Sequence, residues 1–389
     1  MRFSVLLPTR EGGPLLDGCI RSVLSQGGDE IELVVADNAN TDETQEVLRA
    51  HSSDPRLVVT RSERPLPVTE NWRAALERSS GDYVVVLNDD DILLPGYFDR
   101  AESLLRAHGD PDCLTCASTL YIFPDAVEGE RRSYFRDPAY PSEGVMTEGE
   151  VPAAERRRRV ELMFRDFGLG HCFPSVQRTL ISRASIERLR QGLFQPPFPD
   201  LYGIAALCLT AARWVVTPER LVVTGTSSGS FWHLTFTGRL DEGVRYLGNE
   251  VDGPLPGDLT LNTMLANLGA LKRDYPDQLE GVEPNRPLYV ARQVWSWVRA
   301  WRAGAIGGRE LRGRLRGLSR RDLGSLARAP FQPEVRAVAR TALRAHLRGE
   351  TMLRSEHFLP VPEPAVEDIS DFARWLEENQ GRERAAAGG

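Results

Sequence analysis

The stretch Tyr83-Val84-Val85-Val86-Leu87-Asn88-Asp89-Asp90-Asp91 decides how the rest of this chain can fold. Its first five residues are aromatic, β-branched or aliphatic, which predicts a strand buried on both faces. The three carboxylates that follow cannot share this burial, because an unpaired buried charge is very costly. The carboxylates at the end of the strand must therefore contact water or a cation.

The chemistry of this acidic end points to a ligand site. Parallel sheets in α/β proteins bind ligands at the carboxyl ends of their strands. A cluster of carboxylate oxygens there suits Mg²⁺ or Mn²⁺, especially when the ion is shared with a phosphate. An acidic turn that caps a helix beginning near Pro95 is the alternative interpretation.

Strands and helices alternate upstream of this stretch. Strands are predicted at residues 3–7, 31–36 and 57–60, and helices at 15–24 and 69–79. Between the second and third strands, Asn40 is expected to cap a helix with Glu43 as its reciprocal partner. Alternation with short loops predicts an α/β fold whose mostly parallel sheet has helices on both faces.

Composition and missing motifs exclude several classes. The chain has 389 residues and a net charge of −7, which argues against a nucleic-acid partner. Its first turn lacks both G-x-G-x-x-G and G-x-x-x-x-G-K-[ST], so a usual dinucleotide-binding unit and a P-loop NTPase are excluded. Cys113 and Cys116 form a lone CxxC, for which we expect buried thiols on a strand and no zinc. With neither a signal peptide nor a membrane span apparent, we expect a cytoplasmic protein.

Four motifs occur in a fixed order over about the first 100 residues. They are Pro8-Thr9-Arg10-Glu11, Asp37-Asn38-Ala39-Asn40-Thr41-Asp42, Asn71 with Ser79-Ser80-Gly81, and Asn88-Asp89-Asp90-Asp91. In this order and spacing they resemble glycosyltransferase family 2. The resemblance implies the GT-A fold, a Rossmann-like sheet, in a catalytic domain over residues 1–235. A mostly helical region over 236–389 would then serve the acceptor side or oligomerisation.

The resemblance also implies an activity. The expected enzyme is a metal-dependent, inverting glycosyltransferase that moves a sugar from a nucleoside diphosphate, UDP or dTDP, to an acceptor hydroxyl or amine. Mn²⁺ or Mg²⁺ would be held by Asp90 and Asp91, with Asp90 as the first choice for direct contact and His233 as a later ligand. The residues expected to contact the donor, with Asp37 reading the base, are Pro8, Thr9, Glu11, Asp37, Asn71, Asn88 and Asp89.

An inverting reaction also needs a general base. Asp200, in Phe198-Pro199-Asp200-Leu201-Tyr202-Gly203, stands where the family places an aspartate at the start of a helix. The helix N-terminus is expected to favour its ionised form. A plain N-cap of a buried helix is the alternative. Residues 121–170 are expected to be an irregular acceptor loop or lid, and His171 to face the sugar or to be structural.

Departures from the family pattern keep a second function open. Asn88 and Asn38 replace aspartates, and Glu11 replaces an asparagine; each Asn keeps an oxygen but loses a charge. A catalytically inactive relative that binds nucleotide or glycan, or serves as a scaffold, is therefore the alternative. A sugar-1-phosphate nucleotidyltransferase is disfavoured, because its Gly-rich, Arg-containing first loop is not matched by residues 10–13.

The last third of the chain reads as helical and locally basic. Helices are expected at residues 262–274, 288–302, 309–318, 335–347 and 369–379. Trp295, Trp297 and Trp301 are expected to pack these helices onto the catalytic domain or onto a second copy in a homo-oligomer. Residues 292–348 carry 14 Arg against 3 acidic residues, which leaves contact with anionic lipid open beside a simple solvated surface. The acceptor, a glycan, a lipid-linked sugar or a natural product, is not specified.

Overall fold

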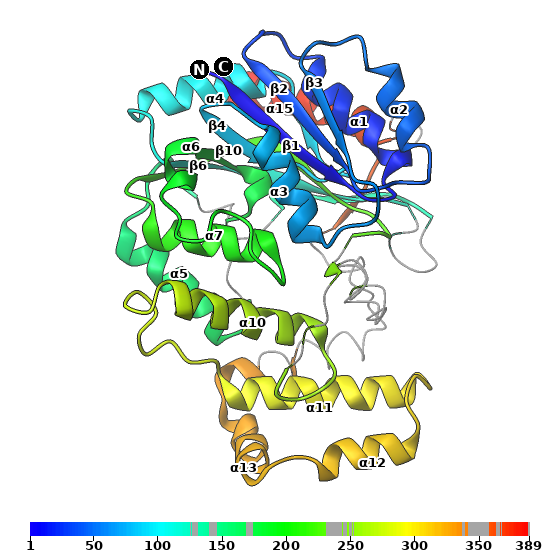
Figure 1. Ribbon diagram of the computed structural model, residues 1–389, viewed down its shortest axis with the longest axis vertical. Coiled ribbons are helices and arrows are strands. Elements are labelled where there is room, and N and C mark those ends of the chain that lie inside the picture. Colours follow the sequence, from blue (N-terminus) through cyan, green and yellow to red (C-terminus); the bar gives the residue numbers. More distant parts are fainter. Residues whose placement is uncertain are drawn as a thin grey trace.

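A computed structural model gives the architecture of the chain (Figure 1). It describes residues 1–124, 126, 131–139, 146–168, 174–230, 243, 247–248, 251, 253–336, 339–340, 358–362, 366 and 368–387.

One mixed sheet forms the centre of the molecule. Its strands run in the order β11-β7-β6-β9-β4-β1-β2-β3, and β10 pairs with β5, β6 and β8. The strands are β1 (Phe3–Thr9), β2 (Ile31–Asp37), β3 (Leu57–Arg61), β4 (Tyr83–Val86), β5 (Ile92–Leu93), β6 (Cys113–Ile122), β7 (Tyr134–Arg136), β8 (Gly149–Glu150), β9 (Thr179–Ser182), β10 (Trp214–Thr226) and β11 (Leu359–Pro360).

The first four strands are parallel to one another, as the sequence predicts. β6 and β10 are also parallel, whereas β9, β7, β5, β8 and β11 join the sheet by antiparallel pairing. The predicted α/β class with a mostly parallel sheet is confirmed, and its strands beyond β4 make the sheet mixed.

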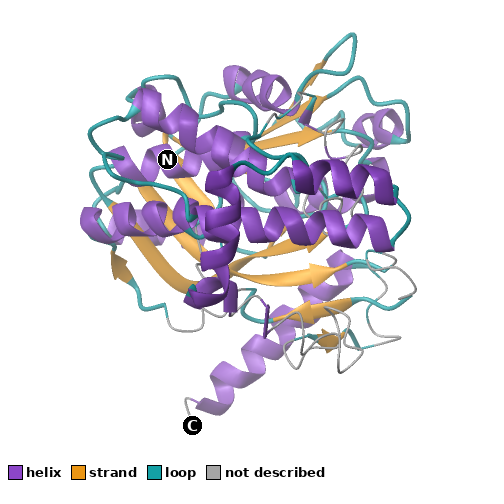
Figure 2. Cartoon of the chain, turned by 90° about the horizontal axis from the view of Figure 1, so that it is seen from below, coloured by secondary structure: helices purple, strands orange, loops and turns teal. Residues whose placement is uncertain are grey.

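Helices cover both faces of the sheet (Figures 1 and 2). They are α1 (Gly13–Leu24), α2 (Thr44–Ala50), α3 (Val68–Arg78), α4 (Tyr97–Ala107), α5 (Ala153–Arg165), α6 (Arg183–Glu187), α7 (Pro199–Thr210), α10 (Leu259–Asp274), α11 (Arg286–Arg302), α12 (Gly308–Arg316), α13 (Arg320–Arg328) and α15 (Ile369–Ala387), with 3₁₀ turns η2 (Val176–Arg178) and η3 (Ala329–Phe331).

Successive side chains of the strands point to opposite faces of the sheet, so the core has two layers. Leu6, Val34 and Val84 pack in one cluster with side chains of α3, α5, α7 and α10. Their neighbours Val5 and Val35 pack in the other cluster, with side chains of α1 and α4. Both sets are buried because successive residues of a strand point to opposite faces, so a two-sided strand must be apolar throughout.

The strand register brings the polar strand ends to one edge of the sheet. Thr9 pairs with Asp37 at the ends of β1 and β2. Leu87 donates its amide to the Leu6 carbonyl at 2.8 Å, so Asn88 and the carboxylates after it leave the sheet beside the end of β1. The apolar run therefore ends where the sheet ends, as predicted from the cost of burying unpaired carboxylates.

The region expected to be an irregular loop contains regular structure. β7, β8 and α5 lie within residues 121–170, so that prediction is wrong for the described part. Arg156, on α5, is buried and donates to the carbonyls of Val151 and Cys208 at 3.2 Å each. It therefore caps backbone groups in the interior and is not available to a phosphate.

The helical region divides into a lobe and a returning segment. α11, α12 and α13 form a lobe at one end of the molecule, with α10 between the lobe and the sheet (Figure 1). α13 was not predicted, and the predicted helix 335–347 falls largely outside the described residues. β11 and α15 return to the sheet, where β11 pairs with β7 and α15 packs near α1 and β5. The domain boundary after residue 235 stays a prediction.

The three tryptophans of α11 have different environments. Trp297 is fully buried and donates its indole N–H to the Pro256 carbonyl at 2.6 Å. Trp295 and Trp301 are 51% and 46% exposed. Only Trp297 therefore packs the helical region internally. None of the described helices combines the length and apolar character needed to cross a membrane.

Phe372→Ala tests the docking of α15. Phe372 is fully buried, and its ring centroid lies 5.0 Å from that of Tyr121 and 5.3 Å from that of Phe135. Removing the ring leaves a cavity, so we expect a loss of about 3–5 kcal/mol in the free energy of unfolding by urea denaturation. Arg374→Ala is the control on the same helix; Arg374 is 73% exposed, and its change should cost below about 1 kcal/mol. Equal losses would mean that α15 does not pack as described.

Candidate active site at the carboxyl edge of the sheet

A cleft of about 530 Å³ opens at the carboxyl edge of β1 and β4. Its walls include the β1–α1 loop, the acidic turn after β4, the start of α3, the start of α7 and the end of β10 with the residues after it. The predicted site residues that line it are Pro8, Thr9, Glu11, Asn71, Asn88, Asp89, Asp90, Asp91 and Asp200. Residues far apart in the chain are thus gathered in one place.

Asp89 is joined to the first strand. The Thr9 hydroxyl donates to Asp89 Oδ2 at 2.7 Å, which links the first and fourth motifs directly. Burial, followed by the neighbouring charge of Asp90, raises the pKa of Asp89 to about 7. Its other oxygen makes no hydrogen bond to a described residue. A carboxylate crowded in this way is stabilised by any cation that enters.

Asp90 is 5% exposed and is held by the chain that follows β10. Its Oδ2 accepts hydrogen bonds from the Ser227 amide at 3.2 Å and from the Ser230 hydroxyl at 2.8 Å. Its Oδ1 makes no hydrogen bond to a described residue. The turn at 227–230 therefore fixes one oxygen of Asp90, a residue that lines the cleft.

Asp91 differs from its two neighbours. Its oxygens accept from the Asn88 amide at 2.9 Å and from the Gly225 amide at 3.0 Å. Burial, then the charge of Asp90, raises its pKa well above the ordinary value for an aspartate. Because backbone amides already bind both oxygens, this carboxylate fixes the turn against β10. The predicted role of Asp91 in metal binding is untested.

The carboxylates at this edge suit an ion that also binds the substrate. No group of three or more His, Cys, Asp or Glu among the described residues could hold a metal by itself. Asp89 and Asp90 both line the cleft, and each has one oxygen that makes no hydrogen bond to a described residue. Mg²⁺ is commonly bound by one or two carboxylates together with substrate phosphates, so this donor set fits a shared ion and does not fit an all-protein metal cage.

Asn40 shapes the first loop and does not cap a helix. Helix α2 begins after Glu43, without a side-chain cap. Asn40 is instead buried, where its Oδ1 accepts from the Glu11 amide at 2.9 Å and its Nδ2 donates to the Thr9 carbonyl at 3.3 Å. The predicted cap is wrong, because this loop offers Asn40 better-placed partners. Glu11, at φ 53°, also accepts from the Thr41 amide at 3.1 Å.

Asp37 does not line the cleft. It is 1% exposed, and its Oδ1 accepts from the Asn40 amide at 2.9 Å. Its Oδ2 accepts from Arg61 at 2.6 Å and from Gln45. Both oxygens are therefore occupied within the protein, and the cleft wall at this point is Asn38. The predicted contact of Asp37 with the base of the donor stays a prediction.

Asn38 and Asn71 are fixed by backbone groups. Asn38 accepts from the Leu66 amide at 2.7 Å and donates to the Leu66 carbonyl at 3.0 Å. Asn71 donates to the Ala36 carbonyl at 3.2 Å. These two amides hold the segment before α3 and the helix itself against the end of β2, so they build the cleft wall.

Asp200 lies in the first turn of α7, as predicted. It is half-buried, and its Oδ1 accepts from the Leu201 amide. Burial raises its pKa to about 7, although that hydrogen bond acts in the opposite direction. The helix N-terminus was expected to favour the ionised form, but desolvation is the larger effect. A carboxylate with this pKa can take up a proton near neutral pH.

Helix α10 fixes the wall that carries Asp200. Asn267 donates its side-chain amide to the Phe198 carbonyl at 3.3 Å, and the Tyr202 hydroxyl donates to Asp274 Oδ2 at 2.7 Å. The two bonded residues, Phe198 and Tyr202, lie on either side of Asp200 in the sequence. The helical region therefore helps to position this carboxylate.

One wall of the cleft was not predicted from the sequence. The end of β10 and the residues after it, Thr224–Ser230, line the cleft together with Gln177 and Arg178. The run of small polar residues Thr224-Gly225-Thr226-Ser227-Ser228-Gly229-Ser230 was the available signal, because small side chains allow close approach of two backbones. Its partner, however, lies more than 130 residues earlier, as the bonds to Asp90 and Asp91 show.

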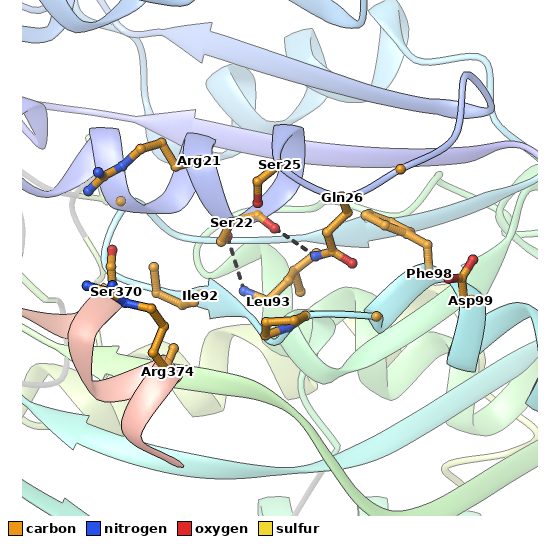
Figure 3. A pocket seen from close by; sticks show the side chains of 15 residues that line it. Arg21, Ser22, Ser25, Gln26, Ile92, Leu93, Phe98, Asp99, Ser370 and Arg374 are labelled. Atoms are coloured by element: carbon orange, nitrogen blue, oxygen red, sulfur yellow. Dashed lines mark hydrogen bonds between the residues drawn. The ribbon is translucent and has the colours of Figure 1, made fainter. Parts of the chain in front are cut away.

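Two predicted histidines cannot be placed. His233 and His171 lie outside the described residues, so the predictions for them stay open. A second cleft, of about 520 Å³, lies between α1, the β5–α4 segment and α15 (Figure 3). It contains none of the predicted site residues. Its arginines are already paired, Arg21 with Asp17 at 3.0 Å and Arg374 with Asp371.

Comparison with known proteins agrees with the sequence resemblance. An uncharacterized protein of Mycobacterium tuberculosis is 29% identical over 130 residues, which make up 33% of this chain and 40% of that protein. A GalNAc(5)-diNAcBac-PP-undecaprenol beta-1,3-glucosyltransferase of Campylobacter jejuni is 30% identical over 98 residues, 24% of this chain and 31% of that protein. The chain thus covers less than half of the length of these curated relatives.

Among solved structures, S. aureus TarS 1-349 in complex with UDP-GlcNAc is similar with a TM-score of 0.45 and 17% identity, over 76% of this chain and 81% of that one. The profile of Glycosyl transferase family 2 matches residues 4–186. This segment contains the β1 loop, the end of β2, the start of α3 and the acidic turn, which together build most of the cleft. Residues 4–186 of this chain therefore belong to glycosyl transferase family 2.

Proposed function

We propose that this protein transfers a sugar from a nucleoside-diphosphate donor to an acceptor hydroxyl or amine, with inversion at the anomeric carbon. The carrying observation is that one cleft holds both the acidic turn tied to β1 and a second carboxylate, Asp200, with a pKa near neutrality. Family membership supports the reaction class. UDP or dTDP remains the proposed nucleotide.

Asp89 and Asp90 are the residues that would hold Mn²⁺ or Mg²⁺, each through the oxygen that makes no hydrogen bond to a described residue. The ion, when bound, neutralises charge that develops on the diphosphate leaving group. Thr9 orients Asp89, and the turn at 227–230 orients Asp90, so neither carboxylate needs to reorganise when the donor arrives.

Asp200 acts as the general base in this proposal. Its carboxylate takes the proton of the acceptor hydroxyl while the acceptor oxygen forms a bond to the anomeric carbon. The bond from that carbon to the diphosphate breaks with its electron pair on the leaving oxygen. The products are a glycoside, a nucleoside diphosphate and a protonated Asp200, which returns its proton to water.

Asp90→Ala tests the cation site. We expect the affinity for UDP in the presence of Mn²⁺ to fall by about 10- to 100-fold, since a direct ligand should matter at least as much as an outer-shell partner. Calorimetry with Mn²⁺ and with chelator measures this. In the unaltered protein the Mn²⁺-dependent affinity should rise with pH through about 7, because Asp89 must lose its proton before it can bind the ion.

Asp29→Ala is the matched control for this test. Asp29 is exposed and lies at the opposite end of β2 from the cleft, so its loss removes a charge but no proposed ligand. If Asp90→Ala and Asp29→Ala bind UDP and Mn²⁺ equally well, the proposed cation site is wrong.

A catalytically inactive binding or scaffold protein is the second candidate, and the replacement of a carboxylate by Asn88 in the acidic turn favours it. Hydrolysis of a nucleotide sugar in the presence of Mn²⁺ would count against it. Thermal-shift measurements with a panel of nucleotide sugars and Mn²⁺ would identify the donor. A glycan, a lipid-linked sugar and a natural product all remain proposals for the acceptor, as does a homo-oligomer formed through the C-terminal helices.

A further inference from the structure

The helical lobe formed by α11, α12, α13 and η3 exposes large apolar side chains beside many arginines. Its exposed apolar side chains are Trp295, Trp301, Leu315, Leu323 and Phe331, with exposed fractions from 38% to 78%. Residues 292–331 contain ten arginines and two acidic residues, in a chain whose net charge is −7. Exposed apolar groups gathered in one region commonly mark an interaction surface.

The spacing places apolar and basic side chains on shared stripes. On α11, Trp295, Arg299 and Arg302 follow one another at intervals of four and three residues, and all are exposed. On α13, the exposed Arg320 and Leu323 are three residues apart. Each stripe thus presents an apolar group beside a cation, and Figure 2 views this end of the molecule from below.

Most exposed arginines of this surface make no ion pair with a described residue. Both acidic residues are already paired: Glu310 with Arg314 at 2.6 Å, and Asp322, which is buried, with Arg286 at 2.6 Å. The exposed arginines that make no ion pair with a described residue are Arg299, Arg302, Arg309, Arg312, Arg316, Arg320, Arg321 and Arg328. Exposed cations at this density attract an anionic partner.

We infer that this lobe is a docking surface for an anionic lipid membrane. The arginines bind the lipid headgroups, and the tryptophan, leucine and phenylalanine side chains enter the boundary between headgroups and acyl chains. Tryptophan is well suited to that boundary, because its ring is apolar and its N–H is polar.

Two other partners fit the surface less well. Trp295, Trp301 and Phe331 could stack on bases, but Leu315 and Leu323 cannot and would stay exposed beside a phosphate backbone, whereas all five can enter a lipid boundary. A second copy of the chain would bring two arginine clusters together, and like charges in one interface are unfavourable. The inference concerns a surface and does not depend on the proposed sugar transfer.

Flotation of the full-length protein with vesicles tests the inference. We expect binding to vesicles of phosphatidylcholine mixed with phosphatidylglycerol, little binding to phosphatidylcholine alone, and loss of binding at high salt. The triple variant Arg312→Glu/Arg316→Glu/Arg320→Glu should reduce binding to the mixed vesicles by at least about tenfold. Circular dichroism checks that the variant is folded.

A second triple variant tests whether a loss of vesicle binding comes from the lobe or only from the change in net charge. Arg49, Arg64 and Arg78 are exposed, make no ion pair with a described residue and lie away from the lobe. The variant Arg49→Glu/Arg64→Glu/Arg78→Glu changes the net charge equally and should keep most of the binding. Equal losses in the two triple variants would overturn the inference.

Fluorescence tests the apolar contact separately. Lipids brominated near the headgroup end of their acyl chains should quench tryptophan emission of the bound protein, and Trp295→Phe/Trp301→Phe should remove most of this quenching. Absence of quenching would contradict insertion. Binding to single-stranded DNA in preference to the mixed vesicles, or dimerisation in solution that the lobe variant abolishes, would overturn the membrane assignment.

Discussion

Replacing Asp200 with asparagine is expected to lower turnover by about 100- to 10,000-fold, while affinity for the donor nucleotide stays unchanged. The amide fills the same space in the first turn of α7 but cannot accept the acceptor's proton. Because burial places the pKa of Asp200 at about 7, the rate of the unaltered enzyme should rise as the pH increases through 7 and then level off. Release of UDP from the donor, followed over pH 5–9, measures both effects.

Asp99→Asn is the matched control. Asp99 is also in the first turn of a helix, α4, but it is exposed and lies at the second cleft (Figure 3). Its replacement should leave both turnover and the pH profile unchanged. If Asp200→Asn instead keeps normal turnover, or keeps the rise near pH 7, another group is the base and the assignment of Asp200 fails.

Gly225→Ala is expected to destabilise the protein by about 1–3 kcal/mol and to lower activity by about 100-fold. A Cβ atom at this position would lie 1.9 Å from the carbonyl oxygen of Asp90, so one of the two backbones must move. The Gly225 amide also binds Asp91 at 3.0 Å, and that bond would be strained by the same movement. Thermal unfolding and UDP release measure the two effects.

Gly229→Ala tests the same loop without the clash. A Cβ atom there would meet only Ser227 Oγ, at 3.9 Å, which is an ordinary contact. We expect stability and activity close to those of the unaltered protein. Similar behaviour of Gly225→Ala and Gly229→Ala would show that close contact between β10 and the acidic turn is not required.

The sequence predicted the parallel half of the sheet well and the mixed half poorly. Strands such as Tyr83–Val86 are short, apolar and bounded by polar residues, so local pattern is enough to recognise them. β9 and β10 find their partners across long sequence separations, and β10 shifts register between Thr217 and Val222. No local pattern encodes such pairing.

The same distinction holds for the candidate site. Thr9 and Asp89 follow strands that are adjacent and parallel, so their meeting could be expected from the order of motifs. The family resemblance implied that Asp37 contacts the base of the donor, but its ion pair with Arg61 depends on the exact placement of β3 beside β2. The hydrogen bonds from Ser227 and Ser230 to Asp90 depend on the conformation of a loop. Its small polar residues are common in many kinds of loop, so they do not indicate this partner.

Helix α10 has a consequence for engineering. It bonds to the Phe198 carbonyl and to Tyr202, the two residues that bracket Asp200 at a distance of two positions on each side. A chimera that grafts the helical region of a relative onto this sheet would separate α10 from these partners. Such an exchange should therefore carry residues 198–202 along with the graft, so that the helix and its anchoring points remain a native pair.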